Sequence, residues 1–365
     1  MTTDTVGGVW NYALELAASL QPHGVQIGLA TMGQPLNAAQ REAVSALRHV
    51  EVFESRYKLE WMDDPWDDVD RAGEWLLDLA GLYRPDLVHL NGYVHGALPW
   101  RLPILMVGHS CVLSWWEAVK GDNAPPEWDM YRELVTQGLR CAQTVVAPTQ
   151  TMLSSLNQFY GPFHQARVIH NARDPRDFQP GGKARLIFAS GRLWDEAKNL
   201  AAVEKVAPKV AWPIYLAGEN QAPGGGLAVF GNMNYLGRLA QPEIAHWFGR
   251  ASIYVHPARY EPFGLCVLEA ALSGCAMVLG DIPSLRELWD GVALFVDPTD
   301  HAGLAAAVTQ LIEDVSLRHE LAAAAQGKAR LFSPARMGAE YLAAYEELLN
   351  QEAVGVESDA LTVGV

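Results

Sequence analysis

The chain has 365 residues, half of them hydrophobic and 19% charged, with a formal net charge of −15. This length favours two domains, and the acidic balance argues against partners such as nucleic acid or an anionic membrane surface. No apolar run is long enough for a transmembrane helix, and the start of the chain lacks the basic residues of a signal peptide. The four cysteines form no CxxC motif and are typical of reduced packing residues. We therefore expect a cytoplasmic protein.

A glycine pair opens the first helical segment. Gly7 and Gly8 close a polar loop, and apolar residues then recur at helical spacing as far as Leu20. Glycines at a helix N-terminus let backbone N–H groups approach an anion, although many tight turns also use such a pair. In an α/β domain a strand should lead into this loop, yet only Met1 precedes Thr2. We therefore expect either that the first strand is missing or that the native start lies upstream of Met1.

The segment Asp68-Val69-Asp70 matches a D-x-D pattern that could hold a divalent metal. A metal-binding pattern of this kind would be expected at the end of a strand. Here a helical pattern follows at once, and acidic residues suit the first turn of a helix because they face its positive end. We therefore predict no metal site.

Polar residues follow a buried strand at 103–107, in the sequence Gly108-His109-Ser110. Side chains at strand ends line the cleft of a doubly wound domain, so His109 is a candidate site residue. The alternative is a buried histidine with satisfied hydrogen bonds.

A polar stretch rich in proline and glycine, residues 173–182, is typical of a linker. It predicts a first domain at 1–172 and a second at 183–332. A helix at 333–350 and a tail at 351–365 should follow.

The second domain opens with a strand at 186–189 and a turn whose only cations are Arg192 and Lys198. Both would be unremarkable on a surface, but a bound diphosphate needs such charges near a helix start. Further on, Leu239 lies between a short strand and a helix that begins near Pro242.

The chain is organised around residues 252–294, which predict a strand, a loop, an apolar helix ending at Gly274, and a second strand. Glu261 lies in the loop and Glu269 on the apolar helix. A buried carboxylate costs several kcal/mol unless it has a partner. For Glu269, ligand hydroxyls could be that partner, or an arginine or backbone N–H could pair with it; the two glutamates alone leave both interpretations open.

The run Glu261-Pro262-Phe263-Gly264-Leu265, with Glu269 eight residues after Glu261, resembles the E-x7-E signature of the retaining GT-B glycosyltransferases, in the glycosyl transferases group 1 family (GT4-like). Glu287 occupies the place of the family's next acidic residue, whereas residues 281–283 replace its usual Gly-Gly pair. The resemblance implies an α/β GT-B fold. Two Rossmann-like domains would face each other across a cleft, and a C-terminal helix would cross back to the first.

The resemblance also implies roles for the candidate residues. Glu269 would bind the ribose of a nucleotide sugar, Glu261 would lie by its sugar ring, and His109 would contact the sugar. The catalytic set would be Glu261, His109, Arg192 and Lys198. The donor-binding set would be Gly7, Gly8, Arg192, Lys198, Leu239, Phe263, Gly264, Leu265 and Glu269.

The implied reaction moves a hexosyl group, with retention, from a nucleotide sugar to a saccharide or small-molecule acceptor, without a metal or another cofactor. One alternative is a nucleotide-sugar epimerase on the same fold. Another is a non-catalytic protein that binds nucleotide sugars or glycans.

Overall fold

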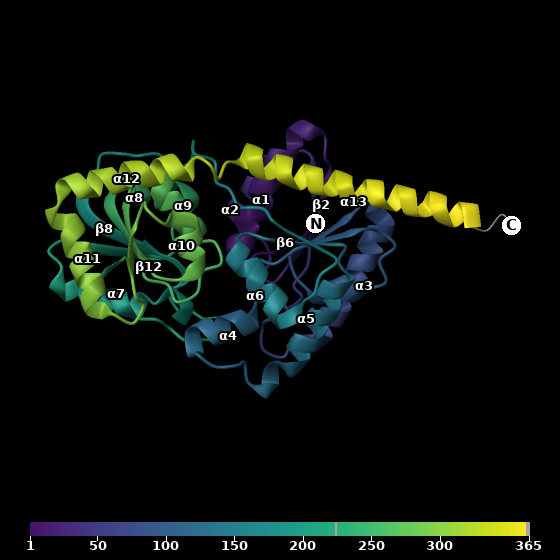
Figure 1. Ribbon diagram of the computed structural model, residues 1–365, viewed down its shortest axis with the longest axis horizontal. Helices are drawn as coiled ribbons and strands as arrows, with labels where there is room; N and C mark the ends of the chain where they lie inside the picture. Colours follow the sequence, from purple (N-terminus) through teal and green to yellow (C-terminus); the bar gives the residue numbers. More distant parts are fainter. Residues whose placement is uncertain (223–224, 363–365) are drawn as a thin grey trace. The chain divides into compact units, whose positions relative to one another are not determined.

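The computed structural model describes residues 1–222 and 225–362, with side chains in the last helix as far as Gln351. The chain divides into two compact units. Unit 1 comprises residues 1–114, 123–170 and the C-terminal helix from Pro334, and unit 2 comprises residues 115–122 and 171–333. In each unit, helices flank a set of parallel strands (Figure 1).

The described part of unit 1 has seven strands in two hydrogen-bonded groups, with the orders β1-β2-β3 and β4-β5-β6-β7. The strands are β1 (Thr2–Asp4), β2 (Ile27–Met32), β3 (Val50–Glu54), β4 (Val88–Leu90), β5 (Ile104–Val107), β6 (Thr144–Ala147) and β7 (Gln165–Val168). Asn91, directly after β4, joins the two groups. Its backbone N–H donates to Thr2 Oγ1 (2.9 Å) and its side-chain amide donates to the Thr2 carbonyl (2.7 Å). The order of strands therefore reverses between β1 and β4, which is where open α/β sheets bind ligands.

The helices of unit 1 include one that begins at the predicted glycine pair. They are α1 (Gly8–Leu20), η1 (Gln21–His23), α2 (Ala38–Ser45), α3 (Trp66–Tyr83), η2 (Val94–Ala97), η3 (Pro126–Trp128), α5 (Asp129–Cys141), α6 (Gln150–Tyr160) and α13 (Pro334–Thr362). The D-x-D segment lies within the first two turns of α3, as its helical pattern predicts. Helix α4 (Val112–Lys120) begins in unit 1 and ends in unit 2.

Two expectations about unit 1 need correction. The first strand is not missing, because Thr2–Asp4 forms β1 and pairs in parallel with residues 30–32 of β2; three residues are too few to show a periodic pattern in the sequence. The last helix is longer than the predicted span of 333–350, since α13 continues to Thr362. It replaces most of the predicted tail, in which no proline stops the helix. Residues 363–365 of that tail lie outside the described residues.

Unit 2 has six strands among its described residues, in the order β10-β9-β8-β11-β12-β13. They are β8 (Ala184–Ser190), β9 (Ile214–Ala217), β10 (Asn234–Tyr235), β11 (Ala251–His256), β12 (Ala276–Gly280) and β13 (Leu294–Val296). Alternate residues of a strand face opposite sides of a sheet. Accordingly, Phe188 and Tyr254 pack into one core cluster, while Ile187 and Ile253 pack into another. The sheet is thus buried on both faces, as its nearly continuous apolar strands predict.

Most strands of unit 2 are followed by a helix, although β10 follows β9 directly. They are η4 (Glu196–Lys198), α7 (Leu200–Val206), η5 (Ala207–Lys209), α8 (Gln241–Arg250), α9 (Leu265–Leu272), α10 (Pro283–Trp289), α11 (His301–Glu313) and α12 (Val315–Ala329). The stretch 173–182, predicted as a linker, packs on this unit. Its Phe178 is buried in the cluster that contains Phe188, and its Arg173 is also buried.

Candidate active site

The site in unit 2 is built where its strand order reverses. Strands β8 and β11 are neighbours, yet the chain leaves β8 toward β9 and leaves β11 toward β12. The loop after β8 carries Arg192 and Lys198, and the loop after β11 carries Glu261. Parallel strands end at the same edge of a sheet, so the topology brings these three predicted residues to one place.

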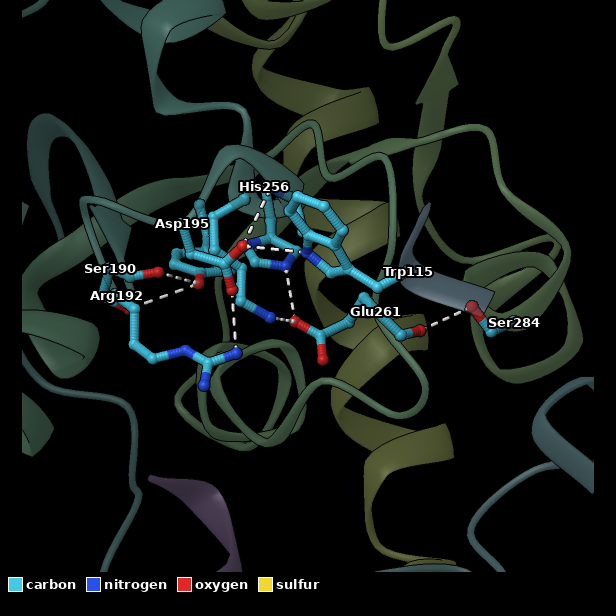
Figure 2. A network of polar contacts seen from close by, with 10 residues as sticks. Trp115, Ser190, Arg192, Asp195, His256, Glu261 and Ser284 are labelled. Atoms are coloured by element: carbon cyan, nitrogen blue, oxygen red, sulfur yellow. Dashed lines mark hydrogen bonds and ion pairs between the residues drawn. The ribbon is translucent and has the colours of Figure 1, made fainter. Parts of the chain in front are cut away.

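One carboxylate oxygen of Glu261 accepts two hydrogen bonds. Its Oε2 lies 2.7 Å from the Lys198 ammonium and 3.0 Å from Nε2 of His256, the last residue of β11 (Figure 2). Burial raises the pKa of Glu261, but Lys198 and His256 outweigh it and hold this pKa well below the usual value. The other oxygen of Glu261, Oε1, accepts no hydrogen bond from the residues that the structure describes.

The loop that carries Glu261 is fixed by backbone geometry. Gly264 has a φ of +83° and precedes α9, and a Cβ there would lie 3.0 Å from a methyl of Val267 and 3.2 Å from Cγ of Glu261. Glycine is therefore required for this turn. The Ser284 hydroxyl donates to the Glu261 carbonyl (2.6 Å). Val267 N–H donates to the Gly264 carbonyl, whereas helix geometry offers no acceptor within the helix to the N–H groups that precede it. This end of α9 is therefore compatible with an anion.

Arg192 is held by a carboxylate from its own turn. Its Nη2 donates to Asp195 Oδ2 (2.8 Å), and its guanidinium lies over the Trp194 ring. Asp195 is buried and also accepts from the indole N–H of Trp115 (3.3 Å). Figure 2 shows Arg192 and Trp115 reaching Asp195 from different sides. The side chain of Arg192 remains 41% exposed, so it is accessible to an anion.

Glu269 is paired with an arginine. Arg173 Nε donates to Glu269 Oε1 (2.7 Å), and both side chains are almost fully buried. Burial raises the pKa of Glu269 although Arg173 opposes the shift. The pKa of the Cys266 thiol is raised to about 12. Burial is the main cause, and the negative charges of Glu269 and Glu261 add to it. The two carboxylates of the E-x7-E motif therefore share one neighbourhood.

The other predicted residues of unit 2 have mainly structural surroundings. Phe263 is buried and its ring meets that of Phe332. Leu265 is the first residue of α9, and Leu239 lies two residues before α8; both pack against the core cluster that contains Phe263.

In unit 1, the glycine pair lies at the start of α1. Gly7 is the N-cap residue and an added Cβ there would meet nothing within 4 Å, while Gly8 is the first helical residue. Asp4 Oδ1 accepts from the N–H groups of Val6 (2.9 Å) and Gly7 (3.1 Å). The loop therefore curls around a carboxylate of the chain itself, which shows that its N–H groups can face an anion.

His109 follows β5 and contacts Asn91. Because the Asn91 amide nitrogen donates to Thr2, its Oδ1 faces His109 Nε2 at 2.8 Å and must accept from it. This bond places the proton of His109 on Nε2 and leaves Nδ1 as an acceptor. Burial lowers the pKa of His109 to about 3, so the ring is neutral at pH 7. The Tyr12 ring packs edge-on against it, with centroids 4.5 Å apart.

Sequence reasoning missed three residues of the site. They are Arg173, which lies in the stretch predicted as a linker, and Asp195 and His256, neither of which is among the predicted site residues. Only His256 carried a signal, because it is a polar residue at the end of an apolar run and needs a partner when it is buried; Arg173 and Asp195 lie beside other charged residues.

Within the part of the chain that the structure describes, no three His, Cys, Asp or Glu side chains gather as a metal site would require. None of the described helices has the length and apolar character needed to cross a membrane.

Together, two Rossmann-like units and a switch-point site with paired charges define a GT-B glycosyltransferase. The model described as Glycosyltransferase Family 4 matches residues 6–177, and that described as Glycosyl transferases group 1 matches residues 184–314. The chain belongs to the group 1 glycosyltransferase family, which confirms the resemblance carried by the E-x7-E motif.

Named relatives agree with this assignment. The chain is 24% identical to a D-inositol 3-phosphate glycosyltransferase of Thermobispora bispora over 98% of this chain and 94% of that one. Some other curated relatives match over shorter stretches, and the chain spans between 28% and 50% of their length.

Solved structures share the fold at low identity. Sucrose-phosphate synthase of Thermosynechococcus elongatus superposes with a TM-score of 0.80 at 16% identity, over 96% of this chain and 99% of that one. Anabaena Alr3699/HepE, crystallised with UDP-glucose, has a TM-score of 0.74 at 18% identity, over 94% and 99% of the two chains.

Proposed function

We propose that the protein transfers a sugar from a nucleotide sugar to an acceptor hydroxyl, with retention of anomeric configuration and without a metal, in the cytoplasm. The observation that carries the proposal is the pair formed by Lys198 and Glu261 at the switch point of the unit 2 sheet, with Oε2 of Glu261 also bound by His256. Both side chains of the pair are 13% exposed, so a ligand can reach them.

Arg192 and Lys198 supply the positive charge that the leaving group needs. Charge builds on the departing nucleoside diphosphate, and donors placed beforehand stabilise it in the transition state. Arg192 and Lys198 each have a carboxylate partner in this structure. A diphosphate would approach cations that are already oriented, so little side-chain freedom remains to be lost on binding.

One carboxylate oxygen of Glu261 is hydrogen-bonded within the protein, and the other can accept a hydrogen bond from a ligand. Lys198 and His256 hold Oε2, which fixes the rotamer and leaves Oε1 to accept from a sugar hydroxyl. Its depressed pKa keeps the carboxylate ionised at neutral pH, and an ionised acceptor makes the stronger hydrogen bond. This geometry supports a position beside the sugar ring.

The donor also needs contacts for its nucleoside. In the proposed complex Glu269 accepts from the two ribose hydroxyls, and the backbone near Leu239 meets the base. Arg173 pairs with Glu269 and opposes the rise in the pKa of Glu269 that burial causes, which favours the ionised carboxylate that this role uses. UDP-glucose is the first donor to test because HepE was crystallised with it.

Retention is proposed to proceed on one face of the sugar, where the leaving phosphate oxygen helps to deprotonate the acceptor. This route requires no side-chain base. His256 is buried behind Glu261, with 2% of its side chain exposed, which suits a positioning residue rather than a base that reaches the acceptor.

The test is a panel of nucleotide sugars, each with and without a mixture of saccharide and polyol acceptors. The proposal predicts acceptor-dependent release of nucleoside diphosphate, without added metal and in the presence of EDTA, and NMR should show that the product keeps the donor's anomeric configuration. Formation of an epimerised nucleotide sugar in the absence of an acceptor would indicate that the protein is an epimerase. Binding without turnover for every pair would indicate the non-catalytic alternative.

A further inference from the structure

Asp195 is the centre of a hydrogen-bond network in unit 2 (Figure 2). Its side chain is only 5% exposed. Oδ1 accepts from the backbone N–H of Ala197 (3.0 Å) and from the indole N–H of Trp115 (3.3 Å), while Oδ2 accepts from Nη2 of Arg192 (2.8 Å). A buried carboxylate needs such donors. Because two of them meet at Oδ1, they also fix the orientation in which Oδ2 faces Arg192.

Trp115 reaches this network from a distant part of the chain. It lies on α4, in the stretch 115–122, which belongs to unit 2 although the residues on either side belong to unit 1. A second contact joins α4 to the same turn, between Lys120 Nζ and Glu196 Oε2 (2.7 Å). The side chains of that pair are 34% and 58% exposed, and exposed ion pairs contribute little. The bond from Trp115 to the buried Asp195 is therefore the stronger connection between α4 and the turn.

A structural role alone accounts for only part of the network. Asp195 precedes the short helix η4, and the bond from the N–H of Ala197 makes it the N-cap residue of that helix. An N-cap needs no more than such a bond. The bonds from Trp115 and Arg192 are additional, and they meet on one carboxylate. The network thus connects α4 to Arg192, one of the two cations proposed for the diphosphate.

Arg192 is oriented by this network and can still donate to a ligand. Within the described part of the chain, Nη2 is the only guanidinium nitrogen of Arg192 that donates a hydrogen bond. The Trp194 ring lies beside the guanidinium, with its centroid 5.3 Å from Cζ, yet the side chain is 41% exposed. Nη1 and Nε can therefore donate to phosphate oxygens while the bond to Asp195 is kept. A guanidinium that is already oriented loses less conformational freedom on binding.

We propose that Trp115 is a positioning residue for the donor diphosphate. Its indole N–H helps to set the orientation of Asp195, and Asp195 sets that of Arg192. The inference rests on the proposed function, in which Arg192 binds the diphosphate, and it extends that site to α4. The formal charges of Arg192 and Asp195 cancel, so Trp115 contributes to the geometry of the site and not to its net charge.

The test removes the indole N–H and keeps every charge. Trp115→Phe should weaken the calorimetric binding of UDP, or of the nucleoside diphosphate of whichever donor the panel selects, roughly three- to tenfold, as the loss of one net hydrogen bond implies. Trp116→Phe is the matched control, because Trp116 is the adjacent half-buried tryptophan and its ring also lies near Lys120. It should bind as the parent does. Arg192→Ala is measured in parallel.

A second readout needs no variant. In proton–nitrogen correlation spectra of the parent, the indole signal of Trp115 should shift as the nucleoside diphosphate saturates the protein, because the ligand acts on Arg192 and so on Asp195. The indole signal of Trp116 should shift less. A Trp115 signal that stays in place at saturation would overturn the proposal, also in the case that Trp115→Phe does not fold.

The results separate this inference from the proposed function. If Arg192→Ala weakens binding and Trp115→Phe does not, Arg192 keeps its role at the diphosphate and the positioning role of Trp115 is wrong. Equal losses for Trp115→Phe and Trp116→Phe would assign the effect to the packing of α4 and would also overturn it. If Arg192→Ala binds as the parent does, or the parent binds no nucleoside diphosphate, the role of Arg192 in the proposed function fails together with this inference.

Discussion

The Lys198 ammonium and the Glu261 carboxylate lie 2.7 Å apart, and they come from loops 63 residues apart in the chain. Each side chain is 13% exposed. The pair joins the cation proposed for the diphosphate to the carboxylate proposed for the sugar. Changes at either residue should therefore affect different parts of the same ligand.

Lys198→Ala should weaken binding of a nucleoside diphosphate by about 1.5–3 kcal/mol, the range for hydrogen bonds to charged groups, or roughly 10- to 150-fold. Calorimetric titration measures this change. Lys205→Ala is the matched control, because Lys205 is an exposed lysine on the adjacent helix α7. Equal affinities for the parent and Lys198→Ala would remove Lys198 from the donor site.

The variants Gly7→Ala and Gly264→Ala should distinguish an effect on ligand binding from an effect of backbone strain on folding stability. Gly264 has a φ of +83°, so alanine there should cost about 1–2 kcal/mol of folding stability. A Cβ at Gly7 meets nothing in the protein, so Gly7→Ala should leave the unliganded Tm nearly unchanged. It should still weaken nucleotide-sugar binding if the loop approaches the donor. An unaltered affinity would contradict that role for the glycine pair.

Glu269→Ala should lower the free energy of unfolding by about 3–5 kcal/mol, because the buried Arg173 would lose the carboxylate of Glu269. Glu269→Gln should cost less, since its amide oxygen can still accept from Arg173. If Glu269 holds the ribose, Glu269→Gln should also weaken nucleoside diphosphate binding at least about tenfold. A variant that loses stability but binds as the parent does would assign Glu269 to structure alone.

Glu60 should make stability depend on pH near neutrality. Burial raises its pKa to about 7, although the N–H groups of Val94 and Tyr93 oppose the shift. Its folded pKa is therefore above the unfolded value, so its contribution to stability is complete below about pH 4.5 and is lost as the pH rises through 7. The Tm of the parent should fall between pH 5 and pH 8 more steeply than that of Glu60→Gln. Parallel pH profiles would contradict the raised pKa.

Local patterns predicted much of unit 2. The strand, loop, helix and strand around Glu261 and Glu269 follow from apolar spacing and from glycines at the turns. The parallel order of strands then brings the loops after β8 and β11 together without any knowledge of their side chains. The neighbourhood of Arg192, Lys198 and Glu261 was predictable for that reason.

Charge partners were not predictable. Arg173 lies in a stretch whose prolines and glycines indicated a linker, yet it pairs with Glu269, 96 residues further on. Composition indicates how a segment is solvated on average but not which single residue finds a buried partner. Strand β1 was missed for a different reason, since its three residues gain their register only by pairing with β2.

The central claim is that Glu261 meets the sugar of the donor and not its nucleotide. Calorimetric titration of the parent and Glu261→Gln with UDP and UDP-glucose, or with whichever nucleotide sugar the panel selects, tests it directly. The account predicts that Glu261→Gln binds the nucleoside diphosphate nearly as the parent does but binds the intact nucleotide sugar at least about tenfold more weakly, since only the sugar reaches Oε1. Equal losses for both ligands, or no loss for either, would contradict it.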